Sequence, residues 1–176
     1  MPYKNKAIYH GYFQTEKYFT NRNLILNLFE PSDFVLSNLE KYKDILQGNT
    51  CAIHVRRGEY SLNPQSKHYT KDMAWYNSAM GIINAEHYIV FSDDIEYARQ
   101  NFIGDKFIFV EDKDYIELFL MSLCKHNIIS SSSFSWWGAW LNKNDNKKVI
   151  APAKWFGTIE SNYLDIDIVP ESWIKL

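Results

Sequence analysis

The sequence predicts an α/β protein in which a parallel sheet carries helices on its faces. Short apolar segments alternate with helical segments over residues 50–151, which is the pattern of βαβ units. The chain has 176 residues, 46% of them apolar, which is enough for one sizeable core. Polar clusters directly follow three of the predicted strands, where parallel sheets bind ligands. We therefore expect a Rossmann-like domain with one site at the carboxyl ends of its strands.

The elements follow in chain order from these patterns. Residues 1–30 lack a clear period and predict an extended approach segment from a missing N-terminal domain, which leaves 31–176 for the Rossmann-like domain. Buried strands are predicted at residues 50–55, 87–91, 106–110, 127–129 and 148–151. Helices are predicted at residues 32–46, 71–83, 93–101, 114–125 and 134–141. A polar loop, residues 56–69, follows the first strand.

Composition limits the classes of partner. The formal net charge of -2 gives no general electrostatic reason to bind nucleic acid or an acidic membrane. The sequence shows neither a leader nor an apolar run of about 18 residues, which predicts a cytoplasmic location. Cys51 and Cys124 fall in a strand and a helix and are expected to be reduced core thiols. The aromatic content of 16% suits either core packing or stacking on sugars or bases.

Two adjacent arginines follow the first strand, and both cannot point into an apolar core. The planar guanidiniums of Arg56 and Arg57 suit a diphosphate, although an ion pair with Glu59 or Asp93 explains them equally well. Glu59 could accept a proton from an attacking hydroxyl if burial raised its pKa, or it could orient an arginine. His54 lies on the strand itself, which favours a hydrogen-bonded core histidine.

Four serines, Ser130 to Ser133, join a strand to a helix. They place hydroxyls and backbone N–H groups at a helix N-terminus, where anions bind, although ordinary capping needs only one of them. The pairs Asp112-Lys-Asp114 and Asp165-Ile-Asp167 match acidic pairs of metal-dependent sugar transferases, but composition alone predicts about one such match. Walker, Gly-x-Gly-x-x-Gly and Gly-x-Ser-x-Gly patterns do not occur in the sequence. The motifs that usually indicate a kinase, a dehydrogenase or a serine hydrolase are therefore absent from it.

Three segments together resemble the α-1,2-fucosyltransferases of glycosyltransferase family 11. They are His54-Val-Arg-Arg-Gly-Glu-Tyr60, in which Glu59 stands where Asp is more usual, Tyr88-Ile-Val-Phe-Ser-Asp-Asp94 and Ser132-Ser-Phe-Ser-Trp-Trp-Gly-Ala-Trp140. Residues 11–19 also look familial. The family's N-terminal glycine-rich stretch does not occur in the sequence, so we expect much of the acceptor-side domain to be missing.

The resemblance implies the C-terminal domain of a GT-B enzyme. The expected reaction is the inverting transfer of fucose from GDP-fucose to the 2-hydroxyl of a terminal galactose on a glycan, with no metal and no other cofactor. Peripheral contact with the inner face of the membrane fits such a substrate. Arg56 and Arg57 would then hold the diphosphate in place of a metal and, with Glu59, form the catalytic set.

The same resemblance assigns the substrate contacts. Asp93 and Asp94 would shape the nucleotide site, and Glu117 would contact guanine. The remaining contacts expected within the motifs are those of His54, Tyr60, Ser132, Ser133, Phe134 and Ser135.

Two other functions stay open on the sequence. A truncated, catalytically silent module would bind the GDP-sugar without transferring the sugar. A carbohydrate-binding domain would stack tryptophans on glycans regardless of GDP, but adjacent arginines at a strand exit argue against it.

Overall fold

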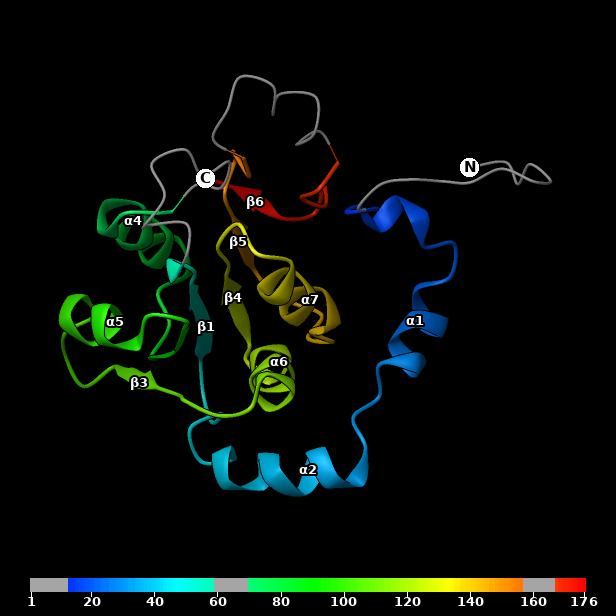
Figure 1. Cartoon of the computed structure of the whole chain (residues 1–176), viewed down its shortest axis with the longest axis horizontal. Coiled ribbons are helices and arrows are strands. Elements are labelled where there is room, and N and C mark those ends of the chain that lie inside the picture. Colours follow the sequence, from blue (N-terminus) through cyan, green and yellow to red (C-terminus); the bar gives the residue numbers. More distant parts are fainter. Residues whose placement is uncertain (1–12, 59–69, 157–166) are drawn as a thin grey trace.

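The computed structural model describes residues 13–58, 70–156 and 167–176 and has an α/β fold in which helices flank a parallel sheet (Figure 1). The strands lie in the order β3-β2-β1-β4-β5-β6. This is the order of Rossmann folds, so the predicted fold class is confirmed. The strands are β1 (Thr50–Val55), β2 (His87–Ser92), β3 (Phe107–Phe109), β4 (His126–Ile128), β5 (Val149–Ala151) and β6 (Ile174–Lys175).

Strand β1 is central in the sheet. Its residue Ile53 lies opposite Val90 of β2 on one side and Ile128 of β4 on the other. All six residues of β1 are buried, as expected for a parallel strand covered by helices on both faces. The five strands predicted from the sequence agree with the structure to within one residue at each end. The two-residue strand β6 was not predicted.

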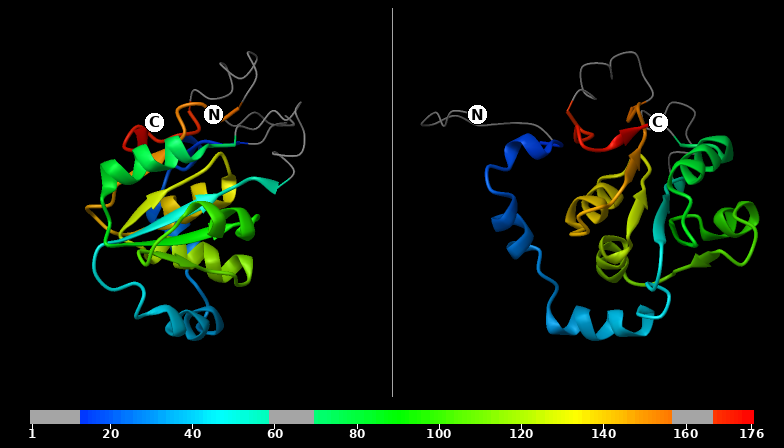
Figure 2. Two further views of the ribbon diagram at one scale, coloured as in Figure 1. Left: turned by 90° about the vertical axis from the view of Figure 1, so that its left-hand side faces the viewer. Right: turned by 180° about the vertical axis from the view of Figure 1, so that it is seen from behind.

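Helices cover both faces of the sheet (Figures 1 and 2). The core residues of α4 and α5 pack with Ile53, Val55 and Val90 on one face. The core residues of α6 pack with Ala52 and Ile89 on the other face, where α7 lies beside α6. These helices are α4 (Met73–Ile83), α5 (Ile95–Asn101), α6 (Asp114–Leu123) and α7 (Ser133–Leu141).

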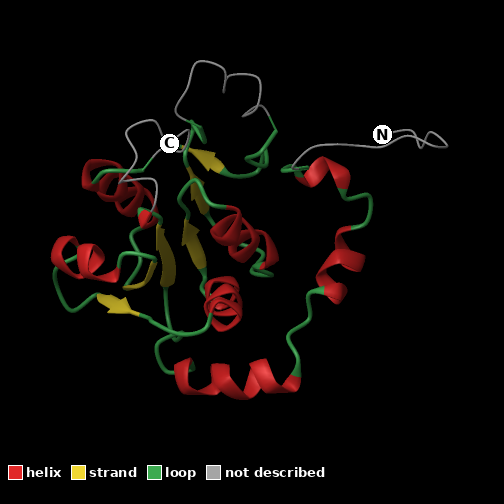
Figure 3. Ribbon diagram, viewed as in Figure 1, coloured by secondary structure: helices red, strands yellow, loops and turns green. Residues whose placement is uncertain are grey.

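The first part of the described chain differs from the extended segment that was expected. Residues Arg22–Leu28 form helix α1, and Glu16–Tyr18 form a 3-10 helix (Figure 3). Arg22 donates a hydrogen bond from Nη2 to the carbonyl oxygen of Trp140 at 2.8 Å, and its guanidinium lies 4.2 Å from the Trp140 ring centroid. Helix α1 therefore depends on contacts with α7, which a local sequence pattern does not reveal.

Helix α2 (Asp33–Leu39) is shorter than predicted. Ser32 caps its start, as expected, but the helix gives way at Glu40–Tyr42 to a 3-10 helix instead of continuing to residue 46. Cys51 and Cys124 are buried free thiols, and burial raises the pKa of both, which confirms their prediction as core residues. Within the three described ranges, no helix is long and apolar enough to span a membrane.

Candidate functional site

A cavity of about 480 Å³ lies at the carboxyl end of β1, beside the loop that leads from β4 into α7. Connections from β1 lead to β2 and β3 on one side, whereas β4 begins the other side of the sheet, so this is the switch point at which Rossmann folds bind ligands. We call it the switch-point cavity. Its lining comprises His54, Arg56, Ser92, Asp93, Ile95, Glu111, Asp112, Asp114, Glu117, Ser132 and Phe134.

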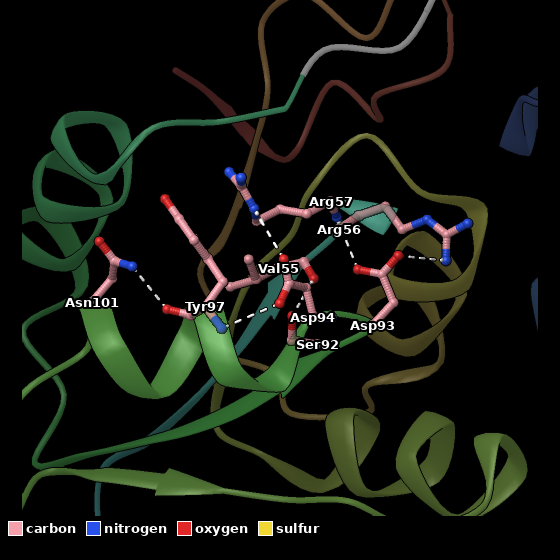
Figure 4. A network of polar contacts seen from close by, with 8 residues as sticks. All are labelled: Val55, Arg56, Arg57, Ser92, Asp93, Asp94, Tyr97 and Asn101. Atoms are coloured by element: carbon pink, nitrogen blue, oxygen red, sulfur yellow. Dashed lines mark hydrogen bonds and ion pairs between the residues drawn. The ribbon is translucent and has the colours of Figure 1, made fainter. Parts of the chain in front are cut away.

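The two arginines that follow β1 diverge. Figure 4 shows the side chain of Arg56 extending to one side of the strand exit and that of Arg57 extending to the other. Arg56 lines the switch-point cavity, whereas the guanidinium of Arg57 lies 3.6 Å from the ring centroid of Tyr97 on α5. Successive side chains of an extended chain point in opposite directions, which explains the divergence. The structure thus brings one of the two predicted arginines to the cavity.

Asp93 fixes the position of Arg56. Its Oδ2 lies 3.0 Å from Nη1 of Arg56, and its Oδ1 accepts the backbone N–H of Arg57 at 2.8 Å. Gly58 makes room for this carboxylate, because a Cβ at Gly58 would collide with Asp93 Oδ2. The Arg-Arg-Gly sequence and the aspartate after β2 therefore form one unit, and a side chain at Gly58 would disturb it.

Asp94 and Arg57 form a separate contact on α5. Asp94 caps that helix by accepting the backbone N–H of Tyr97 at 3.2 Å. Its Oδ2 lies 3.4 Å from Nε of Arg57, an ion pair without the geometry of a hydrogen bond. Since neither residue lines the switch-point cavity, their contacts stabilise the start of α5 and the exit of β1.

His54 links the two halves of the sheet. Its Nδ1 lies 2.8 Å from Oγ of Ser130, and its ring lies 5.7 Å from that of Phe134, centroid to centroid. Burial, with the nearby charge of Arg56, lowers the pKa of His54 to about 3. The imidazole is therefore neutral at pH 7 and is a hydrogen-bonded core histidine that also reaches the cavity wall.

The N-terminus of α7 lies at the cavity without a side-chain cap. Ser132 is the N-cap residue, yet within the described part of the chain no side chain accepts a hydrogen bond there. A side-chain oxygen caps α1, α2, α4 and α5, whereas α6, like α7, has no side-chain cap from its N-cap residue. Because Ser132 and Phe134 line the cavity, the first turn of α7 offers backbone N–H groups and a positive dipole end to an anion there.

Carboxylates that follow β3 form another part of the lining. Glu117 Oε1 accepts the backbone N–H of Asp112 at 2.9 Å, and burial raises the pKa of Glu117. Nζ of Lys41 lies 2.7 Å from Oδ2 of Asp112, and the hydroxyl of Tyr42 donates a hydrogen bond to the same oxygen at 2.7 Å. The hydrogen bond from Lys41 lowers the pKa of Asp112 to about 2. One cavity thus combines a guanidinium and a helix N-terminus with several carboxylates.

The structure separates the predicted site residues. It places six of them at the switch-point cavity: His54, Arg56, Asp93, Glu117, Ser132 and Phe134. Ser133 lines a different cavity, and Ser135 has no exposed surface and donates to the carbonyl oxygen of Ser132 at 3.3 Å. Glu59 and Tyr60 lie outside the described residues.

Sequence reasoning missed several residues of the lining. Glu111, Asp112 and Asp114 follow β3 just as Arg56 follows β1. The strand-exit rule used for three other strands would have found them, but the acidic pair was considered only as a metal site. Ile95 was missed as well, whereas Ser92 belongs to one of the three polar clusters that the sequence placed at the ends of the strands.

The fold and the cavity define a Rossmann-type α/β protein with an uncapped helix N-terminus at its switch point. The sequence matches the model of glycosyl transferase family 11 over residues 1–174. The chain therefore belongs to glycosyl transferase family 11.

Three curated proteins illustrate the sequence similarity of this chain to known glycosyltransferases. The O-antigen biosynthesis glycosyltransferase WbnK of Escherichia coli is 36% identical over 98% of this chain and 62% of its own length. An alpha-1,2-colitosyltransferase of the same species is 32% identical over 98% of this chain and 63% of its own length. Human galactoside alpha-(1,2)-fucosyltransferase 1 is 31% identical over 53% of this chain and 29% of its length. The chain thus spans just under two thirds of the length of the two bacterial relatives.

Among solved structures, POFUT1 in complex with GDP is similar at a TM-score of 0.49 and 14% identity, covering 72% of this chain and 47% of that one.

Proposed function

We propose that the switch-point cavity binds GDP-fucose and that the chain is the donor-binding part of a galactoside α-1,2-fucosyltransferase. The observation that carries the proposal is the meeting of Arg56 with the uncapped N-terminus of α7 at one cavity. Together they provide the positive charge that a diphosphate needs. The galactoside and the 1,2 linkage are inferred from the motif resemblance and from the names of two relatives.

The carboxylates suit the base of the nucleotide. Guanine presents N–H donors on its Watson–Crick edge, and a carboxylate can accept two of them. Glu117 is held in place by its hydrogen bond to the backbone of Asp112, which orients it for such a contact. We therefore propose that the diphosphate lies against Arg56 and α7 and that guanine lies toward Glu117.

In the proposed reaction, the bond between C1 of fucose and the β-phosphate oxygen breaks, and its electron pair leaves with GDP. The 2-oxygen of galactose forms a new bond to C1 from the opposite face, so the β-linked donor gives an α-linked product. The hydroxyl proton passes to a carboxylate base, for which Glu59 is the candidate. Arg56 and the α7 dipole stabilise the charge that develops on GDP, so the reaction needs no metal.

The experiment is a calorimetric titration of GDP, with UDP and ADP as controls, together with fucose transfer from GDP-fucose to lactose in EDTA. We expect GDP to bind in preference to the other two nucleotides and transfer to persist in EDTA. Absence of GDP binding, or a transfer rate unchanged by Arg56→Ala, would refute the assignment.

Two outcomes would select related functions. GDP binding without transfer would identify a donor-binding module that is silent by itself. If the chain transfers colitose in preference to fucose, its donor carries the sugar after which one relative, the alpha-1,2-colitosyltransferase, is named.

A further inference from the structure

A second cavity, of about 360 Å³, has Ser133 of the first turn of α7 in its lining. Aromatic side chains form much of its lining, so we call it the aromatic cavity. They are Phe13, Phe19, Trp136, Trp137 and Trp155. Its volume is within the range of small-molecule sites, which is about 300–1,000 Å³.

The two cavities meet at consecutive residues of the chain. Ser132 and Phe134 line the switch-point cavity, and Ser133, between them, lines the aromatic cavity. Adjacent Cα atoms are about 3.8 Å apart, so the first turn of α7 forms part of the rim of both cavities. A ligand in the aromatic cavity would lie next to one in the switch-point cavity.

Hydrogen bonds and ring contacts hold the walls of the aromatic cavity. Trp136 donates from Nε1 to the carbonyl oxygen of Ile168 at 2.7 Å. The Trp137 ring lies 5.3 Å from that of Trp136 and 5.5 Å from that of Phe19, centroid to centroid. Binding to such fixed rings costs little side-chain entropy, so the cavity is preorganised for a rigid ligand.

Polar groups stand beside these rings. Gln14, Thr15 and Ser133 belong to the same lining, and Gln14 and Ser133 are exposed. A pyranose has an apolar C–H face and an edge of hydroxyls, and it needs this combination of a stacking surface with hydrogen-bonding groups. Core packing alone explains the contact of Phe19 with α7, but it does not explain an open cavity with polar groups in its lining.

We propose that the aromatic cavity is the subsite for the terminal galactose of the acceptor. The proposal rests on the proposed function for the identity of the sugar and deepens it by placing the acceptor. Galactose in the aromatic cavity would lie beside the donor at the shared first turn of α7, with its 2-hydroxyl directed past Ser133 into the switch-point cavity, which provides the proximity that transfer requires. Phe13, at the exposed end of the lining, would contact the sugar directly.

The test compares two phenylalanines. Phe13→Ala removes an aromatic ring from the cavity, and Phe34→Ala removes one from α2, away from both cavities. Phe13 and Phe34 are 45% and 63% exposed, so neither substitution removes a ring from the hydrophobic core. Lactose binding is measured by calorimetry in saturating GDP, and GDP binding is measured separately.

We expect Phe13→Ala to weaken lactose binding about 10-fold, which is about 1.4 kcal/mol, with GDP affinity within twofold of the wild type. Phe34→Ala should change neither affinity. Ser133→Ala should weaken lactose binding, and Ser132→Ala should weaken GDP binding.

Each outcome decides between the two proposals. Lactose binding that is indifferent to Phe13→Ala and Ser133→Ala overturns the acceptor subsite even if GDP binds. GDP binding without any lactose binding overturns it as well. Lactose binding that depends on Phe13 in a protein that does not bind GDP supports the subsite and refutes the donor assignment.

Discussion

The imidazole of His54 and the hydroxyl of Ser130 lie 2.8 Å apart and join the end of β1 to the loop after β4. These residues are 76 positions apart in the sequence, yet their contact closes the sheet at its switch point. The side chain is almost fully buried beside Arg56 and Phe134, so its protonation state is coupled to the stability of this junction.

Acid should destabilise the fold through His54. Its folded pKa of about 3 is below the unfolded value of 6.5, so the unfolded state binds more protons between these pH values. The stabilisation is complete above pH 6.5 and is lost as the pH falls toward 3. Lowering the pH from 7 to 5 should reduce the free energy of unfolding by about 2 kcal/mol, measured by urea denaturation.

His54→Asn should flatten that pH dependence, because Asn keeps a polar partner for Ser130 without titrating. Burial also lowers the pKa of His126, so part of the dependence should remain. His87→Asn, at an exposed position, is the matched control and should leave it intact. If the free energy of unfolding depends on pH equally in His54→Asn and in the wild type, the acid sensitivity does not come from His54.

Arg56 and Arg57 should have separable roles. Arg56→Ala should lower kcat/KM for GDP-fucose by about 100-fold or more, because it removes the guanidinium that lines the switch-point cavity. Arg57→Ala should lower the free energy of unfolding by about 1 kcal/mol, through loss of its contact with Tyr97, with a smaller effect on transfer. Steady-state kinetics and urea denaturation of both variants test this division. Equal losses of kcat/KM would show that both arginines serve the donor.

Gly58→Ala should weaken GDP binding although it adds only a methyl group. That Cβ would displace the Asp93 carboxylate, which holds Arg56 at 3.0 Å. Gly81→Ala is the control, because a Cβ at Gly81 meets nothing within 4 Å. Titration of GDP should show about a 10-fold loss for the first variant and none for the second. Unchanged GDP affinity in Gly58→Ala would mean that Asp93 does not position Arg56.

Gly138→Ala should destabilise the packing of α7 on α6. A Cβ at Gly138 would lie 2.9 Å from Cβ of Met121 and 3.1 Å from its Sδ. Overpacking of this kind costs about 1–3 kcal/mol, which exceeds the gain of up to about 1 kcal/mol from replacing a helical glycine. Thermal denaturation should show a lower Tm for Gly138→Ala and an equal or higher Tm for Gly81→Ala. A stabilised Gly138→Ala would show that α6 and α7 can move apart without cost.

The sequence could predict the sheet because its strands are short, apolar and buried on both faces. Strand β6 was not predicted, because a strand of two residues, Ile174 and Lys175, is too short to show a hydrophobic pattern. Helix α1 was not predicted, because it is held in place by contacts with Trp140 on α7, which lies far along the chain.

The site was predictable as a position but less so in its details. Strand exits identified Arg56 and Ser132, since the carboxyl ends of parallel strands meet at one edge. The divergence of Arg57 follows from the alternation of an extended chain, but the tertiary structure is needed to show which arginine lines the cavity. The aromatic cavity joins residues 13–19 to α7 and to Ile168, and no local pattern connects them.

The place of β1 between β2 and β4 also governs when the site can form during synthesis. Ser130 is added 76 residues after His54, a delay of about 4–15 s at roughly 5–20 residues per second. In that interval β1 can pair with β2, but its other edge stays unpaired until β4 has been synthesised. The nascent protein therefore has its cavity arginine before it has the first turn of α7, and the switch-point cavity is complete only after Ser132 and Phe134 have been added.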